Sequence, residues 1–334
     1  MNGGMELYLH MPFCVRKCAY CDFLSFPTDQ ETQNLYTRRL REDIDAMGKK
    51  YGDIPVDTIF IGGGTPSVPD SALIVGIMEH VRKAFHVAEG AEISMEANPG
   101  TVTREKLTDY RRAGINRLSF GLQSANDREL KLLGRIHTWA EFLESFHLAR
   151  ECGFTNINID LMSALPGQTR ESWKDTLKRV TDLNPEHISA YSLIIEDGTP
   201  FGEKYGSEEG RKLLPDEDSE REMCHETKRF LRDCGYERYE ISNYAKPGRA
   251  CRHNIGYWTG LPYLGLGLGA SSYMDGCRFA VNSDMKQYLE EKPGMFTDVE
   301  KLTKKDMEEE FFYVGLRMTA GVSLPEFERR FGVS

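Results

Sequence analysis

Three cysteines near the start of the chain have a spacing that could hold a metal centre. Cys14, Cys18 and Cys21 form a C-x3-C-x2-C pattern. Thiolates suit soft metals and iron–sulfur clusters. Because a closed structural zinc site needs four protein ligands, the pattern leaves two interpretations. One is a zinc site completed by a distant histidine or cysteine. The other is an iron–sulfur cubane with one iron open to a small molecule.

Further functional side chains follow the ends of consecutive expected strands. They are the cysteines after the first strand, the run Gly-Gly-Gly-Thr-Pro at 62–66 after the second, Glu96 after the third, Gln123 after the fourth and Asp160 after the fifth. In α/β folds, sites form at the carboxyl ends of parallel strands. Five consecutive strand ends therefore predict one shared site.

Each of these residues also has a purely structural explanation. Glycines 62–64 could form a plain turn, although they also let backbone approach a ligand closely, and no Lys-Ser/Thr follows as in a Walker loop. Glu96 could be a satisfied core acid or an acceptor for a ligand amine or hydroxyl. Arg135 could lie on the surface or supply a fork for a carboxylate. Asp160 is placed where a contact to a ribose hydroxyl would be useful.

Up to about residue 195 the chain alternates short apolar runs with helical patterns, which predicts a parallel sheet with right-handed crossovers. The sheet either curls into a barrel or stays open. The expected strands are 7–10, 57–61, 92–97, 117–122, 156–161 and 187–193, and the expected helices are 31–51, 70–86, 103–112, 138–151 and 169–182.

The pattern changes from about residue 200. We expect an exposed linker or loop at 202–212, a helix at 216–234, a strand at 239–244, and helices at 303–317 and from 323. Leucine alternates with glycine at 264–270, which suits a tight turn or backbone packed closely against a partner. Because the last helical pattern runs to Ser334, we expect a truncated C-terminus.

Composition excludes several classes of protein. The 334 residues carry a net charge of -10, which disfavours nucleic-acid binding. No apolar run is long enough for a membrane span, and residues 1–6 lack the features of a signal peptide. We therefore expect a cytoplasmic protein whose cysteines form no disulfides. Three of the five cysteines outside the triplet are expected to be small core residues: Cys152, Cys224 and Cys234.

The triplet, with Tyr20 before its third cysteine, resembles that of radical S-adenosylmethionine (SAM) proteins. The order cysteines, Gly-Gly-Gly-Thr-Pro, Glu, Gln, Arg and Asp is similar to the family of oxygen-independent coproporphyrinogen III oxidases and related heme chaperones. The radical SAM pattern covers about 6–200, and the remainder resembles the C-terminal part of this family. The resemblance implies an α/β fold: a partial (β/α)6 TIM-type barrel over 1–200 and a smaller α+β domain over 201–334.

The resemblance also implies cofactors and their residues. A [4Fe-4S] cluster would sit on Cys14, Cys18 and Cys21, and the methionine amine and carboxylate of SAM would bind the open iron. In such proteins an electron from the cluster cleaves SAM to a 5′-deoxyadenosyl radical. The positions that match SAM contacts in the family are Tyr8, Gly63, Gly64, Thr65, Glu96, Gln123, Arg135 and Asp160.

Two departures separate this chain from the oxidases. Their fourth cysteine, two residues after the third, is replaced by Phe23, and thirteen residues precede Cys14 where the oxidases carry a sizeable extension. His253 to Trp258 match the H-N-x-x-Y-W motif of the heme chaperones. Imidazole is a good axial ligand for heme, and Tyr257 and Trp258 offer flat faces for a porphyrin. The alternative is a structural histidine within an aromatic cluster.

We therefore predict a heme chaperone that binds heme and delivers it to apo-hemoproteins, for example respiratory enzymes at the membrane. Cys251 and Cys277, which flank the motif, are weaker candidates for a second heme ligand. The oxygen-independent oxidation of coproporphyrinogen III is the alternative function, and a zinc-bound scaffold is a third. The sequence leaves open whether the protein forms a homodimer.

Overall fold

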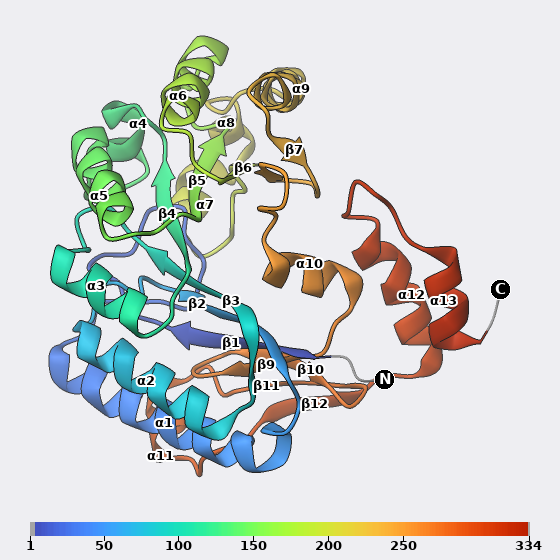
Figure 1. Cartoon of the computed structure of the whole chain (residues 1–334). Coiled ribbons are helices and arrows are strands. Elements are labelled where there is room, and N and C mark those ends of the chain that lie inside the picture. The colour runs from blue at the N-terminus through green and yellow to red at the C-terminus, as the bar shows by residue number, and fades with distance from the viewer. Residues whose placement is uncertain (1–3, 333–334) are drawn as a thin grey trace.

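The computed structural model describes residues 4–332, which share one open, twelve-stranded sheet with the order β12-β11-β10-β9-β1-β2-β3-β4-β5-β6-β8-β7. Its middle six strands are parallel. They are β1 (Met5–Met11), β2 (Val56–Gly63), β3 (Val87–Ala97), β4 (Arg117–Gln123), β5 (Ile157–Ser163) and β6 (His187–Ser192). Because the sheet curls without closing, the predicted partial barrel is confirmed (Figure 1).

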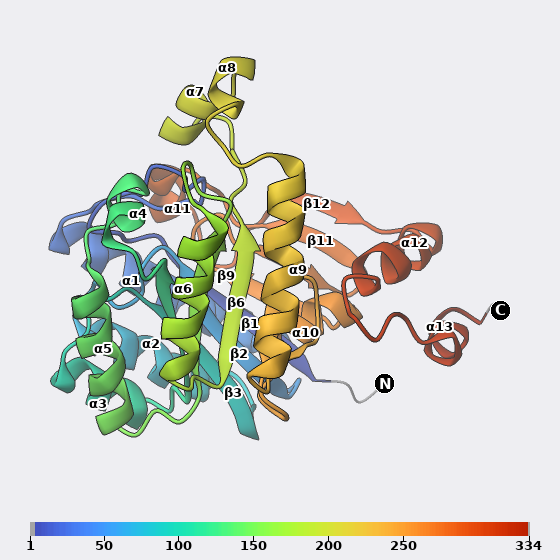
Figure 2. The same ribbon diagram turned by 90° about the horizontal axis from the view of Figure 1, so that it is seen from above.

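Helices connect these strands and lie along one side of the sheet (Figures 1 and 2). They are α1 (Gln30–Tyr51), α2 (Ser71–Ala84), α3 (Arg104–Arg112), α4 (Asp127–Leu132), α5 (Trp139–Glu151) and α6 (Arg170–Asp182). Each begins after an Asp, Asn or Thr whose side chain accepts a backbone N–H of the first turn. Such caps satisfy otherwise unpaired donors, so the starts of these helices are encoded locally. The structure confirms all the predicted strands and helices of this part to within a few residues, apart from the start of β3, and adds α4.

The strands alternate between an apolar outer face and an unusually polar inner face. On β1, Leu7 and Leu9 are fully buried in the core that the helices cover. The inner positions at the amino ends of the strands are Glu6, Thr58, Glu92, Arg117, Asn158 and His187, all buried. Strands buried on both faces are normally apolar throughout. The polar interior therefore indicates that this barrel holds ligands or hydrogen-bonded networks.

The rest of the chain extends the same sheet at both edges. The added strands are β7 (Glu237–Arg238) and β8 (Asn243–Ala245) beside β6, and β9 (Tyr263–Leu266), β10 (Ser271–Met274), β11 (Cys277–Ala280) and β12 (Thr297–Lys301) beside β1. Its helices are α7 (Pro200–Tyr205), α8 (Glu208–Arg211), α9 (Glu217–Asp233), α10 (Arg252–Thr259), α11 (Met285–Glu290), α12 (Lys304–Gly315) and α13 (Leu324–Phe331). The Gly-Leu alternation begins in β9, which pairs with β1, and continues through the turn before β10. Because one sheet spans both parts, the domain division at residue 200 stays a prediction.

Three sequence predictions in this part were wrong. Cys224, on α9, and Cys234, directly after it, are exposed and are not core residues. Residues 202–212 are not a loop, because α7 and α8 fold there, with Phe201 and Tyr205 buried in a small core of their own. Of the expected strand at 239–244, only 243 and 244 are strand, in β8, and 239–242 form the turn between β7 and β8. The Glu240 carboxylate accepts the Ser242 N–H at 2.7 Å, which bends the chain back. The expected break at Ser334 lies outside the described residues, as does half of the segment judged for a signal peptide. Within 4–332, no helix is long and apolar enough to cross a membrane.

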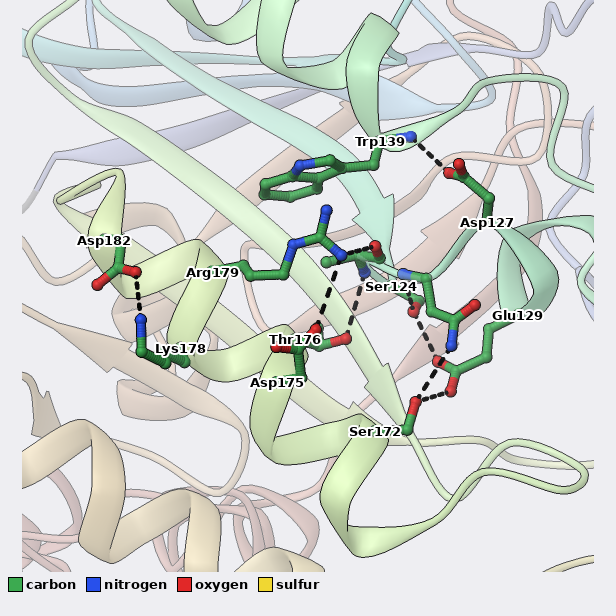
Figure 3. A network of polar contacts seen from close by, with 12 residues as sticks. Ser124, Asp127, Glu129, Trp139, Ser172, Asp175, Thr176, Lys178, Arg179 and Asp182 are labelled. Carbon is green, nitrogen blue, oxygen red and sulfur yellow. Dashed lines mark hydrogen bonds and ion pairs between the residues drawn. The ribbon is translucent and has the colours of Figure 1, made fainter.

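A buried polar network fixes the short helix α4 between α5 and α6 (Figure 3). The Glu129 carboxylate accepts hydrogen bonds from the Ser124 hydroxyl at 2.6 Å, the Gln168 amide at 2.9 Å and the Ser172 hydroxyl. Arg179 donates to the Ala125 carbonyl at 2.6 Å and lies over the Trp139 indole. A six-residue helix has little stability of its own. The network therefore positions the turn after α4, which meets the cysteine loop.

Candidate cofactor site and adjoining cavity

The three cysteines lie on the loop after β1, and three distant segments hold this loop in place. The Cys14 N–H donates to the Phe26 carbonyl at 3.1 Å, and the Ala19 N–H donates to the Leu133 carbonyl at 3.0 Å. The Phe201 N–H of α7 donates to the Ala19 carbonyl at 2.9 Å. The cysteine loop is therefore held by the turn after α4, which belongs to the barrel, and by helix α7, which belongs to the C-terminal part of the chain.

The donor set fits a cluster better than a single ion. Among residues 4–332, no three His, Cys, Asp or Glu side chains converge as ligands of one ion. In a cubane each thiolate binds a different iron and need not converge on one atom. Arg135 donates to the Cys18 sulfur at 3.5 Å. Burial raises the pKa of the Cys21 thiol, which favours its protonated form when no metal is bound.

The glycine segment runs directly along the cysteine loop. The Gly64 N–H donates to the Met11 carbonyl at 2.8 Å, and the Thr65 N–H donates to the Phe13 carbonyl at 2.6 Å. Gly63 has a φ of +109°, and a Cβ there would lie 2.3 Å from the His10 ring. Its N–H donates to the Glu96 carboxylate at 2.9 Å. Position 63 requires glycine because its φ is positive and because the His10 ring leaves no space for a Cβ. The site is therefore tightly packed around Gly63.

Arg135 belongs to this site and not to the surface. Its guanidinium donates to the Asn98 amide oxygen at 2.7 Å and to the Gly121 carbonyl. Asn98 in turn donates to the Thr65 hydroxyl at 2.8 Å. Asn98 was missed in the sequence, where it was taken only as part of the turn that ends a strand. The available signal was its position two residues after Glu96, which places both side chains on the same face.

Hydrogen bonds within the protein hold the side chains of Gln123, on β4, and Asp160, on β5. Gln123 has a φ of +73° and accepts the Tyr191 hydroxyl at 3.0 Å. Asp160 accepts the Ser119 hydroxyl at 2.9 Å and the Asn158 amide at 2.8 Å. Burial raises the pKa of Asp160, and burial together with the nearby Asp160 raises the pKa of Glu96 to about 7. Glu96 and Asp160 are therefore hydrogen-bond acceptors in fixed positions, and a hydrogen-bond donor or cation from a ligand would stabilise their charged forms.

Tyr8 is oriented by His10, a second residue that the sequence did not single out. The His10 Nε2 lies 2.8 Å from the Leu24 carbonyl, and its Nδ1 lies 3.0 Å from the Tyr8 hydroxyl. A carbonyl only accepts, so Nε2 carries the proton and Tyr8 donates to Nδ1. The position of His10, two residues after Tyr8 on the same strand face, was the signal.

A cavity of about 1600 Å³ opens from this site toward the C-terminal helices. Tyr8, His10, Gly63 and Glu96 line its inner end. Its outer wall comes from β9–β11, α10, α12 and α13. That wall combines aromatic side chains with cations: Tyr257, Trp258, Tyr263, Tyr273, Phe311, Arg278, Lys304, Arg329 and Arg330. The cavity is larger than the roughly 300–1,000 Å³ of ordinary ligand pockets.

The predicted heme motif is divided between the cavity and the barrel floor. Tyr257 and Trp258 line the cavity, whereas His253 is 1% exposed and lies beneath it. The His253 Nδ1 lies 2.7 Å from the Thr58 hydroxyl, and its Nε2 lies 3.0 Å from the Tyr257 hydroxyl. Both ring nitrogens are therefore occupied. The axial role of His253 stays a prediction, and this arrangement matches its structural alternative.

The first residues of the motif anchor the N-terminus of α10 to the sheet. The Glu92 carboxylate accepts the backbone N–H groups of Arg252 at 3.2 Å and His253 at 3.3 Å. It also accepts the thiol of Cys251, which is fully buried and away from the cavity wall. A Cβ at Gly256 would lie 1.9 Å from the Glu6 carboxylate. Close packing explains the glycine of the motif, and Cys251 is poorly placed as a ligand.

Comparison with known proteins agrees with this geometry. The radical SAM superfamily model matches residues 8–180, and the HemN C-terminal domain model matches residues 302–334. The heme chaperone HemW of Bacillus subtilis (strain 168) is 37% identical over 331 residues, covering 98% of this chain and 87% of the relative. The chain belongs to the HemW family of radical SAM proteins. The predicted resemblance is therefore confirmed.

Two further relatives support this placement in the HemW family. The heme chaperone HemW of Escherichia coli (strain K12) is 42% identical over 272 residues, covering 80% of this chain and 69% of the relative. The solved structure of coproporphyrinogen III oxidase (HemN) from Escherichia coli, described as a radical SAM enzyme, superposes with a TM-score of 0.85 at 27% identity. That match covers 99% of this chain and 79% of the oxidase. HemW-family and oxidase chains thus share one architecture, so the architecture does not decide between their activities.

Proposed function

We propose that this protein is a cytoplasmic heme chaperone that binds heme and delivers it to apo-hemoproteins, including respiratory enzymes at the membrane. The observation that carries the proposal is the cavity that joins three of the predicted SAM contacts, Tyr8, Gly63 and Glu96, to Tyr257, Trp258 and the C-terminal helices. Its volume leaves room for a porphyrin beside a nucleotide. The heme chaperones among the relatives support the choice of porphyrin.

The cavity wall suits the two faces and the two charges of heme. Aromatic rings pack on a flat porphyrin, and the outer cations suit its propionates. Arg278 is already paired with Glu310 at 2.9 Å, and Arg329 and Arg330 are paired with Glu326 at 2.6 Å. A guanidinium has five donors, so each arginine can hold a propionate while keeping its carboxylate partner.

The cofactor residues would act as follows. Cys14, Cys18 and Cys21 would hold a [4Fe-4S] cluster. Backbone at Gly63 and Gly64 with Thr65, and the side chains of Tyr8, Glu96, Gln123, Arg135 and Asp160, would hold SAM. When bound, the cluster supplies one electron that can cleave SAM. The chain itself provides fixed acceptors at Glu96 and Asp160 for ligand amine or hydroxyl groups, and a cation at Arg135 for a carboxylate.

The test offers ferric heme and, separately, coproporphyrinogen III to anaerobically reconstituted protein with SAM and a reductant. We expect stoichiometric heme binding and no protoporphyrinogen. Turnover of coproporphyrinogen III would establish the oxidase instead. Absence of heme binding, with the cluster present by iron analysis, would refute the chaperone.

A further inference from the structure

The Tyr257 hydroxyl stands at the end of a chain of hydrogen bonds through the barrel floor. It lies 3.0 Å from the His253 Nε2, and the His253 Nδ1 lies 2.7 Å from the Thr58 hydroxyl. Thr58 donates to the Glu6 carboxylate at 3.1 Å. Because the single Thr58 proton points to Glu6, Thr58 accepts from Nδ1. The neutral imidazole then accepts at Nε2, and Tyr257 donates to it.

This direction of hydrogen bonding leaves the lone pairs of the Tyr257 oxygen free. Tyr257 also lines the cavity, whereas His253 is 1% exposed and is absent from the cavity wall. Tyrosine oxygen is an established type of heme iron ligand. The residue of the motif that is free to reach iron is therefore the tyrosine.

We propose that the Tyr257 oxygen is the protein ligand of ferric heme iron in this cavity, and that His253 is the positioning residue that accepts its proton. The inference rests on the proposed binding of heme. The O–H bond of Tyr257 breaks as its oxygen bonds the iron. With Glu6 ionised, the proton passes to His253 Nε2, the Nδ1 proton to Thr58, and the Thr58 proton to the Glu6 carboxylate. The iron stays ferric and no electron moves.

The Tyr257 ring is held in place before heme arrives. It stacks edge-on against His253 at 4.8 Å and against Tyr263 at 4.7 Å between ring centroids. Tyr263 and Tyr273 share the cavity wall, but within residues 4–332 neither hydroxyl bonds a histidine. Preorganisation and a proton acceptor therefore distinguish Tyr257 from Tyr263 and Tyr273. Tyr8 also donates to a histidine, but it lies at the inner end of the cavity among the predicted SAM contacts.

The experiment uses the full chain, loaded with ferric heme, and resonance Raman spectroscopy. We expect high-spin heme with iron-bound tyrosinate vibrations that shift when the protein is produced with ring-deuterated tyrosine. Heme bound without tyrosinate lines would overturn this inference and leave the chaperone proposal standing. Failure to bind heme at all would overturn both. This measurement needs no substitution, so it is independent of how any variant folds.

Three variants then separate the roles. Tyr257→Phe should erase the tyrosinate lines. His253→Gln should keep them while weakening heme binding by about 10–100-fold, as for other residues that orient a metal ligand. Tyr263→Phe, the matched control from the same wall, should change neither spectrum nor affinity. If His253→Gln changes the ligand signature and Tyr257→Phe does not, the histidine is the ligand and the inference is wrong.

Discussion

If Glu96 contacts SAM as proposed, SAM binding should be sensitive to pH, and the structure gives the direction. Burial and the nearby Asp160 raise the pKa of Glu96 to about 7, and the Gly63 N–H holds the carboxylate at the inner end of the cavity. A hydrogen bond to a carboxylate contributes about 1.5–3 kcal/mol, against about 0.5–1.5 kcal/mol for a neutral pair. Protonation of Glu96 should therefore weaken SAM binding by about tenfold in total, with a midpoint near pH 7.

The assay is equilibrium binding of SAM to anaerobically reconstituted protein from pH 5.5 to 8.5. Glu96→Gln should bind with the low-pH affinity of the wild type and lose the midpoint near 7. Glu105→Gln, a solvent-exposed glutamate on α3, is the control and should keep the wild-type profile. A wild-type profile that is flat between pH 6 and 8, or one that Glu96→Gln leaves unchanged, would refute the proposed contact.

Three further predictions concern stability. Gly63→Ala should destabilise the fold by roughly 1–3 kcal/mol from backbone strain alone. The total cost should be larger because the added Cβ meets the His10 ring. Thermal unfolding measures this change, and an unchanged Tm would contradict the prediction. Phe201→Ala should lower the free energy of unfolding by about 3–5 kcal/mol and speed the loss of the cluster in air. The control Leu213→Ala, at a side chain that is 60% exposed, should cost under about 0.5 kcal/mol. Equal effects of the two substitutions would show that α7 does not hold the cysteine loop in place. Burial raises the pKa of Glu6 to about 8. The folded state therefore keeps a proton on Glu6 that the unfolded state releases from about pH 4.5 upward. The free energy of unfolding should fall as the pH rises from about 4.5 through about 8. Glu6→Gln should therefore gain stability relative to wild type across that window, by at most about 1.4 kcal/mol per pH unit, and a parallel pair of unfolding profiles would show that Glu6 ionises normally.

The sequence predicted the barrel well because its signals are local. Apolar runs, helix caps and strand-end residues each depend on a few neighbours in the chain, and the six middle strands formed where expected. The segment at 202–212 was misread because its polar composition resembles a linker, whereas Phe201 and Tyr205 pack on residues from distant elements. Propensity is a weak signal when such tertiary contacts decide the structure.

The sequence predicted which residues at the strand ends belong to the candidate site, but not the hydrogen bonds that connect them. Spacing and strand position located the cysteines, Glu96 and Asp160. Asn98 gains its role only from Thr65 and Arg135, which approach it in the folded chain. His253 shares a hydrogen bond with Thr58, which is far away in sequence. A motif therefore identifies residue types, whereas the hydrogen bonds decide which of them can reach a ligand.

The central claim is heme delivery, and transfer measures it most directly. Heme-loaded protein is mixed with membranes containing an apo-hemoprotein of the respiratory chain, and the absorption spectrum of the reconstituted recipient is followed over time. The account predicts that the recipient acquires heme from the loaded protein faster than an unrelated apo-hemoprotein scavenger in solution does. Equal rates for recipient and scavenger would mean that heme merely dissociates, and would contradict the claim.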